Sequence, residues 1–200
     1  MRYLRKVVPV LLVLVLLVPA YEAQAADSSN WKKLYIDYIN DNPPTEPDMS
    51  SYSLIHINDD DIPELWIDFG LGFEGDALCT VSDGKLDVLR FSQYGLSYIE
   101  RQNLFVVNGG RMDDYNSDVY RIENGKFVRL YKGNYGAENN ANVQYDADGD
   151  PVYRYYWEGK EVSKKGYEQA LSSVFDDSKA IAPNDNSCAA GEIIPQIRRY

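Results

Sequence analysis

A short acidic segment contains side chains whose spacing could hold a metal ion. Asn58, Asp60 and Glu64 occupy the third, fifth and ninth places of a calcium loop, in which alternate oxygen ligands of a curled backbone converge on one hard cation. His56 and Asp61 stand in the first and sixth places, where such loops carry a carboxylate and a glycine. Two interpretations stay open: a calcium site, or a turn whose side chains accept hydrogen bonds from nearby backbone N–H groups.

Two further runs of alternating oxygen-bearing side chains resemble cation loops, namely Asp146, Asp148 and Asp150, and Asp114, Asn116 and Asp118. The first run has Pro151 where glycine is wanted and no carboxylate in the ninth place, so a hairpin turn around Asp148 explains it better. The second run has Val119 in the glycine place. We interpret it as a loop.

Catalysis by an activated nucleophile is disfavoured by the residue types present. His56 is the only histidine, and no G-x-S-x-G turn or clustered zinc ligands accompany it. We therefore expect a structural role for His56. The two carboxylates of a glycosidase exist in any chain with 31 acidic residues, so their presence decides nothing. A hydrolase acting on glycans or cell walls stays as an alternative.

Cys79 and Cys188 are the only cysteines. An even count in an exported chain favours a disulfide, which would tie the C-terminal tail to the middle of the sheet. Two free thiols are the alternative. Neither cysteine has a metal-type spacing or a neighbouring histidine.

An aromatic row is predicted on one strand near the C-terminus. Strand alternation places Tyr153, Tyr155 and Trp157 on one face and Tyr156 on the other. If exposed, such a row could stack on sugar rings or peptide. The interpretation that we favour is a sheet face covered by a helix.

Helices are predicted at both ends of the domain that carries these residues. The first starts at Trp31 after a capping segment, and its apolar residues Trp31, Leu34, Tyr35, Tyr38 and Ile39 recur on one face. The second starts at Ser163, and its apolar face comprises Tyr167, Leu171, Val174 and Phe175. Beyond it, we expect a short terminal segment, held by the disulfide, to dock through Ile193, Ile194 and Ile197.

Between the helices, the chain repeats short strands joined by turns. Asp83-Gly84 and Asn124-Gly125 are dipeptides that fit two-residue hairpin turns. The connections leave no room for parallel crossovers. The predicted fold is therefore α+β: an antiparallel β-meander of about seven to nine strands with one N-terminal and one C-terminal helix packed on it.

The segment HINDDDIPELWI resembles the hydrophobic-D-x-N-x-D-G-x-P-E-L signature of uncharacterised secreted proteins and lipoproteins of Gram-positive bacteria, and more distantly the calcium loops of FG-GAP and integrin-type repeats. The similarity extends to WKKLYIDYI, to the strand-DGK-strand and strand-NGK-strand hairpins and to YYWEGKEVSKKGYEQAL, about Trp31 to Phe175 in all. The resemblance implies an extracellular α+β domain and no reaction. This sequence departs from the signature at His56 and Asp61.

The N-terminal residues predict export. A basic start, an apolar run and the small residues Ala23 and Ala25 are typical of a signal peptide over residues 1–25, leaving a domain over residues 26–200, of which residues 152–200 form the C-terminal strand, helix and tail. A net charge of −11 repels nucleic acid and anionic lipid surfaces. We expect a secreted monomer that binds an extracellular protein or glycan without catalysis, stabilised by calcium in one interpretation. A secreted inhibitor or effector is a further alternative.

Overall fold

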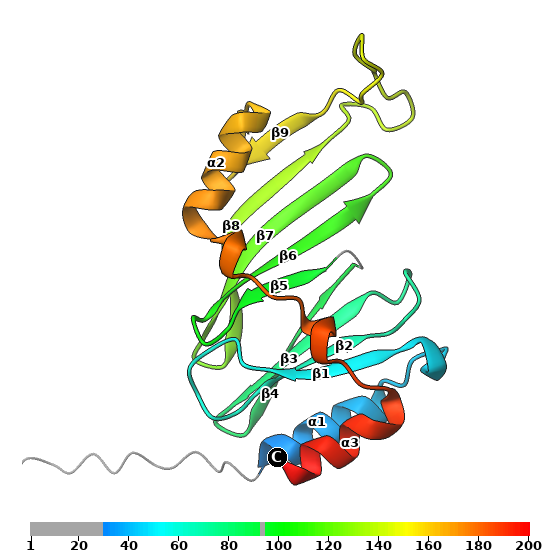
Figure 1. Ribbon diagram of the computed structural model, residues 1–200, viewed down its shortest axis with the longest axis vertical. Helices are drawn as coiled ribbons and strands as arrows, with labels where there is room; N and C mark the ends of the chain where they lie inside the picture. The colour runs from blue at the N-terminus through cyan, green and yellow to red at the C-terminus, as the bar shows by residue number, and fades with distance from the viewer. Residues whose placement is uncertain (1–29, 93–94) are drawn as a thin grey trace, which may run out of the picture.

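The computed structural model describes residues 30–92 and 95–200, so the predicted signal peptide lies outside the described residues. These residues form two antiparallel sheets with helices on their outer faces (Figure 1). The first sheet has the order β1-β2-β3-β4, with β1 (Ser51–Ile55), β2 (Glu64–Asp68), β3 (Asp76–Ser82) and β4 (Lys85–Phe91). The second has the order β10-β9-β8-β7-β6-β5, with β5 (Leu96–Ile99), β6 (Leu104–Arg111), β7 (Asp114–Glu123), β8 (Lys126–Gly136), β9 (Arg154–Trp157) and β10 (Lys160–Val162).

The helices are α1 (Asn30–Asp41), α2 (Lys164–Val174) and α3 (Ala190–Arg199), with 3-10 turns η1 (Pro47–Met49), η2 (Asp177–Lys179) and η3 (Pro183–Asn186). The α+β prediction is confirmed, and in the part of the chain that the structure describes there are ten strands in two sheets of four and six. No helix among the described residues is both long and apolar enough to cross a membrane.

The predicted hairpin turns are present. Asp83-Gly84 joins β3 to β4, and Asn124-Gly125 joins β7 to β8. All four residues have positive φ, between 50° and 68°. This conformation gives the turn the same twist as the strands, and glycine at the second place adopts it without a Cβ clash.

Helices α1 and α3 lie side by side on the outer face of the four-stranded sheet (Figure 1). The buried side chains Trp31 and Tyr35 of α1 and Ile193 and Ile197 of α3 pack in one apolar cluster with that sheet. The spacing of Ile193 and Ile197 is that of one helix face. The tail predicted as a short terminal segment is therefore a packed helix.

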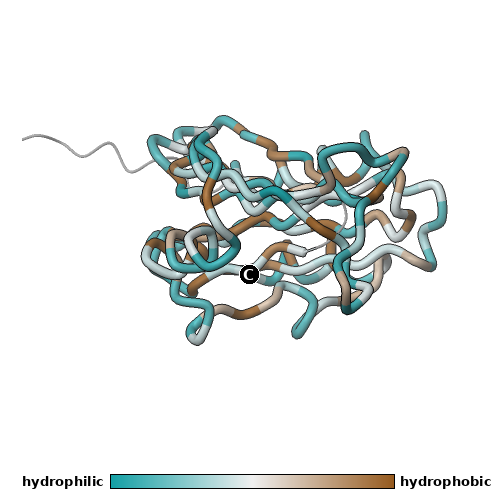
Figure 2. Tube along the Cα trace, turned by 90° about the horizontal axis from the view of Figure 1, so that it is seen from above, coloured by the Kyte–Doolittle hydropathy of each residue, from teal (hydrophilic) through white to brown (hydrophobic). Residues whose placement is uncertain are grey.

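A second apolar cluster lies between the two sheets and includes Ile57, Leu78 and Phe105. A third lies between α2 and the six-stranded sheet, where Phe175 contacts Val106 and Val119. Figure 2 shows hydrophilic residues concentrated in the peripheral loops. The molecule is thus layered: helices, sheet, sheet, helix.

The chain between α2 and α3 runs along one edge of both sheets. Ile181 exchanges two backbone hydrogen bonds with Tyr98 of β5. The Ser53 hydroxyl of β1 donates to the Pro183 carbonyl at 2.6 Å. Cys188 then exchanges two backbone hydrogen bonds with Tyr52 of β1. These bonds give partners to some of the backbone N–H and C=O groups on the outer sides of the edge strands β5 and β1, which would otherwise have none.

Candidate functional site

The acidic corner between β1 and β2 is built as a turn. The Asn58 side-chain oxygen accepts from the Asp60 backbone N–H at 3.3 Å, and Asp60 Oδ1 accepts from the Ile62 N–H at 2.8 Å. The Asn58 amide also donates to Asp60 Oδ2 at 2.7 Å. These bonds are those that the turn interpretation predicts, because short polar side chains fold back on the backbone two residues later.

Glu64 points away from this turn into the space between the sheets. Its side chain is 1% exposed and accepts hydrogen bonds from the Ile57 N–H at 2.9 Å and the Thr80 hydroxyl at 3.2 Å. Burial is the main reason why the Glu64 pKa is raised to about 8. Glu64 therefore stabilises the corner from inside as a carboxyl that the fold favours in its neutral form.

The calcium interpretation stays a prediction with little geometric support. Among residues 30–92 and 95–200, no group of three or more His, Cys, Asp or Glu side chains is placed to hold a metal ion. Asn58 and Asp60 give oxygens to backbone groups of the turn, while Glu64 is enclosed. Calcium prefers six to eight oxygens around one point.

His56 connects the corner to the C-terminus. Its Nε2 contacts the Tyr200 hydroxyl, and Tyr200 also packs edge-on against Trp31 of α1. Burial and then the nearby Arg101 guanidinium lower the His56 pKa, since burial disfavours a charged imidazolium and Arg101 repels its positive charge. The contacts of His56 are those of a packing residue.

The predicted disulfide between Cys79 and Cys188 is wrong, because both cysteines are free. Cys79 lies on β3, whereas Cys188 pairs with Tyr52 on the far side of β1. Strands β1 and β2 lie between them, which amounts to three strand spacings or about 14 Å. A disulfide requires Cα atoms within about 7 Å. Burial raises the pKa of both thiols, so neither is an activated nucleophile.

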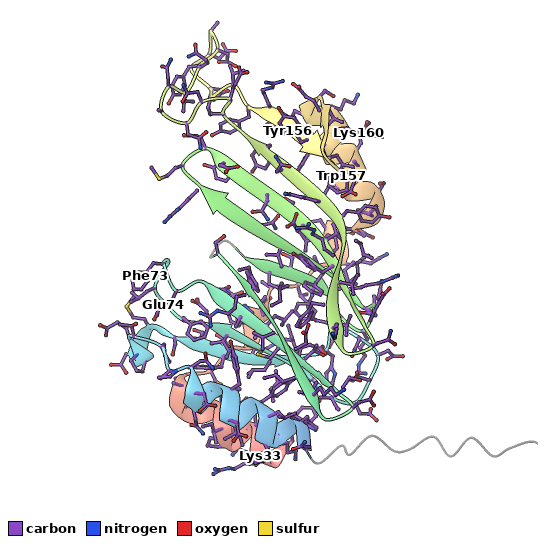
Figure 3. All side chains as sticks on the ribbon, turned by 180° about the vertical axis from the view of Figure 1, so that it is seen from behind. Lys33, Phe73, Glu74, Tyr156, Trp157 and Lys160 are labelled. Atoms are coloured by element: carbon purple, nitrogen blue, oxygen red, sulfur yellow. The ribbon has the colours of Figure 1, made fainter. Side chains whose placement is uncertain are left out.

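Helix α2 covers Tyr155 and Trp157 of the aromatic row, as the favoured interpretation has it, but not Tyr153, which precedes β9 (Arg154–Trp157). Tyr155 and Trp157 contact Tyr167 of α2, with ring centroids 5.7 and 5.8 Å apart. Tyr153 packs against Tyr115 instead and donates to the Asp113 carboxylate at 2.5 Å. Figure 3 shows Trp157 beside this helix. All three side chains of the row are half-buried in protein contacts.

The two remaining acidic runs have different outcomes. Asp146 Oδ1 accepts from the Asp148 and Asp150 N–H groups, both at 2.9 Å, which confirms the turn. The run from Asp114 to Asp118, interpreted as a loop, is the first half of strand β7. Its polar residues alternate because alternate strand residues share a face, and Tyr115 and Val119 lie on the other face. This period of two could have indicated the strand.

A large hollow lies where the two sheets diverge. It is an open cleft with a volume of about 1060 Å³. One wall comes from the loop between β2 and β3 and from the end of β4, and the other from the hairpin between β6 and β7. The lining residues are Gly72, Phe73, Glu74, Gly75, Arg90, Phe91, Ser92, Gly110, Arg111, Met112, Asp114 and Asn140.

Two large apolar side chains stand at the opposite rims of this cleft. Phe73 and Met112 are each 77% exposed. Figure 3 shows Phe73 beside Glu74 on the loop of the four-stranded sheet, at the edge that faces the six-stranded sheet. Exposed Phe and Met side chains cost hydration free energy unless a partner covers them. Sequence reasoning missed both residues because single apolar residues in loops carry no pattern.

The hairpin that presents Met112 has a two-residue turn of the same geometry as the other two, but without a glycine. Met112 and Asp113 have φ of 52° and 64°, a conformation that strains most residues with a Cβ. The Asn140 amide donates to the Met112 carbonyl at 2.9 Å, and the Ala137 N–H donates to the Asp113 carbonyl at 2.8 Å. Together with the bond from Tyr153 to Asp113, these contacts fix the tip. Met112 is therefore held outward on a braced hairpin.

Carboxyls with raised pKa values lie outside the cleft lining. Glu64 is one, and Asp76 on β3 is another: burial and then the neighbouring Asp68 raise its pKa to about 7. The third is Asp118 on β7. Burial raises its pKa, and the Arg129 guanidinium, which pairs with it at 3.4 Å, acts in the opposite direction. Each is less than 9% exposed. The described cleft residues therefore do not include a general acid of this kind.

Comparisons with known proteins found no matching family model, no similar curated protein and no similar solved structure. The resemblance of the acidic corner to secreted Gram-positive proteins therefore stays a prediction.

Proposed function

We propose that this protein is a non-catalytic extracellular binding module whose ligand enters the cleft between the two sheets. The observation that carries the proposal is the exposure of Phe73 and Met112, 77% each, on opposite walls of one hollow. Apolar side chains facing each other across a cleft are typical of a binding site, since a ligand between them removes both from water.

The rigidity of the cleft supports the same proposal. The tip at Met112 is strained and braced by three hydrogen bonds, from Asn140, Ala137 and Tyr153. Local strain that the surrounding structure maintains is common at functional sites. A rim fixed before binding also reduces the conformational entropy lost when the ligand is bound.

A glycan-acting hydrolase is supported less well. Such an enzyme needs two carboxyls on either side of the scissile bond, one of them with a raised pKa. Glu64 and Asp76 have raised pKa values, but they are 1% and 3% exposed and do not line the cleft. A substrate in the cleft would meet neither carboxyl.

A secreted inhibitor or effector would use the same surface. An apolar rim on a chain of net charge −11 favours binding to a protein partner, and inhibition is one consequence of such binding. A binding module and an inhibitor would use the same cleft. They differ in whether the bound partner loses its activity. An assay of partner activity separates them once the partner is known.

The test is photo-crosslinking from the cleft rim. A photoreactive phenylalanine replaces Met112 in one variant and Tyr145 in a control, because Tyr145 is 64% exposed on a different loop and does not line the cleft. Both are incubated with culture medium and surface extracts of the producing cells. We expect an adduct from position 112 only, removed by excess unlabelled protein but not by the F73S/M112S double variant. Equal adducts at both positions, or equal competition by the double variant, would refute the proposal.

A further inference from the structure

We propose that the cleft binds an extended polypeptide segment with one carboxylate flanked by apolar side chains, and that Arg111 receives the carboxylate. This inference rests on the proposed binding function and names its ligand class. It starts from the side-chain partners of the arginines.

Arg111 differs from the other arginines in and between the strands. The side chains of the other five each contact an acceptor. The pairs are Arg90 with the Glu74 carbonyl, Arg101 with Asp59, Arg121 with Glu123, Arg129 with Asp118 and Arg154 with Glu161. Within residues 30–92 and 95–200, Arg111 is the one of these six whose side chain makes no hydrogen bond or ion pair, although Asp114 is its cross-strand neighbour. An unpaired guanidinium in so acidic a chain points to an anionic group on a ligand.

The chemistry of the guanidinium selects the kind of anion. Its planar array of donors matches a carboxylate with two parallel hydrogen bonds. A densely charged polyanion is disfavoured, because the chain has 31 acidic against 20 basic residues and would repel it. Glu74 and Asp114 also line the cleft and add to that repulsion. A ligand with a single carboxylate at this point fits the charges best.

Large apolar side chains line the same cleft as Arg111. Met112 follows it in sequence, Phe73 stands on the opposite rim, and Phe91 lies in the same lining. A carboxylate bound to Arg111 would therefore be flanked by apolar side chains of the same ligand, which bury Phe73 and Met112. The burial of Phe73 and Met112 would supply most of the binding free energy.

The backbone of the cleft favours a polypeptide as the carrier of these groups. β4 is an edge strand, and its last residues, Arg90 and Phe91, line the cleft together with Ser92. Backbone N–H and C=O groups on the outer side of an edge strand have no strand partner. An extended peptide can pair with such groups and direct alternate side chains to the two walls. A volume of about 1060 Å³ accommodates several residues in this conformation.

The experiment measures binding of two sets of fluorescent heptapeptides by anisotropy. Both sets have Val, Leu, Ile or Phe on either side of a central residue, which is glutamate in one set and glutamine in the other. The variant is Arg111→Gln, and the control is Arg121→Gln, an arginine on β7 that pairs with Glu123 and does not line the cleft. Thermal melts verify that both variants fold.

We expect the glutamate set to bind at least tenfold more tightly than the glutamine set. Arg111→Gln should abolish that preference, and Arg121→Gln should keep it. Equal binding of both sets, a preference that survives Arg111→Gln, or binding of an oligouronate but of no peptide would each overturn the inference. If both sets bind equally and F73S/M112S weakens both, the cleft function stands and only the carboxylate assignment fails. If no peptide binds, the peptide class is refuted and the crosslinking result decides the cleft function by itself.

Discussion

Replacing Glu64 by glutamine should make the protein more stable at high pH. In the folded chain, the Glu64 carboxyl accepts from the Ile57 N–H and the Thr80 hydroxyl and is 1% exposed. Burial raises its pKa from 4.5 to about 8, so the fold favours the neutral carboxyl. The stability that this neutral group confers is fully present below pH 4.5 and is lost as the pH rises through 8.

The magnitude follows from the two pKa values. A difference of one pKa unit corresponds to about 1.4 kcal/mol, so ionising Glu64 inside the fold costs up to about 4 to 5 kcal/mol. Glutamine has the same shape, accepts from the Ile57 N–H through its oxygen and does not ionise. Between pH 5 and pH 9, the variant should therefore gain up to about 4 kcal/mol of unfolding free energy relative to the parent chain.

The assay is urea unfolding of both proteins at intervals from pH 5 to pH 9. Glu64→Ala serves as the control, because it also removes the ionisable carboxyl but leaves the buried Ile57 N–H without its acceptor. It should therefore be less stable than the glutamine variant by about 1 to 3 kcal/mol at every pH. A difference between the glutamine variant and the parent chain that does not change with pH would refute the reasoning. A variant that is less stable at pH 9, beside a parent chain that calcium stabilises, would favour the calcium interpretation instead.

Three other predictions test the corner, the thiols and a tight contact. Thermal melts in EDTA and in millimolar calcium should coincide if segment 58–64 is a turn. Calcium binding would instead raise the unfolding free energy, by about 2.7 kcal/mol when the calcium concentration is a hundred times Kd. Cys188→Ser, and likewise dithiothreitol, should change the unfolding free energy by less than about 0.5 kcal/mol, since Cys188 has no disulfide to lose; a large loss in urea unfolding would contradict the free thiol. Gly70→Ala should destabilise by about 2 to 4 kcal/mol in the same assay, because φ is 83° and a Cβ would lie 2.6 Å from the Met49 carbonyl oxygen. Gly149→Ala, at φ 88° with open space around it, should cost only about 1 kcal/mol, and equal losses would exclude the contact with Met49 as the cause.

Much of the fold could be predicted because its signals are local. Asp83-Gly84 and Asn124-Gly125 define hairpins through the φ values that they adopt, and the period of Trp31, Tyr35 and Ile39 defines a helix face. The division of the strands into two sheets could not be predicted in this way. It depends on whether β5 pairs with β4 or only with β6, and the residue pattern of single strands does not decide this.

The candidate site was less accessible to sequence reasoning. The disulfide prediction failed because a count of cysteines does not contain the strand order, and the order places β1 and β2 between Cys79 and Cys188. The calcium-loop spacing predicts that the Glu64 side chain lies beside those of Asn58 and Asp60. In the structure, strand β2 begins at Glu64, and its alternation turns that side chain inward.

The sequence by itself determined several of the strands, the hairpin turns, the faces of α1 and α2 and the acidic charge, because each depends on residues close together in the chain. Only the tertiary structure decided that Phe73 and Met112 line one cleft and that the Arg111 side chain has no partner among the described residues. These residues come from loops of two different sheets, and the relative position of the sheets is set by side chains that pack from distant parts of the chain.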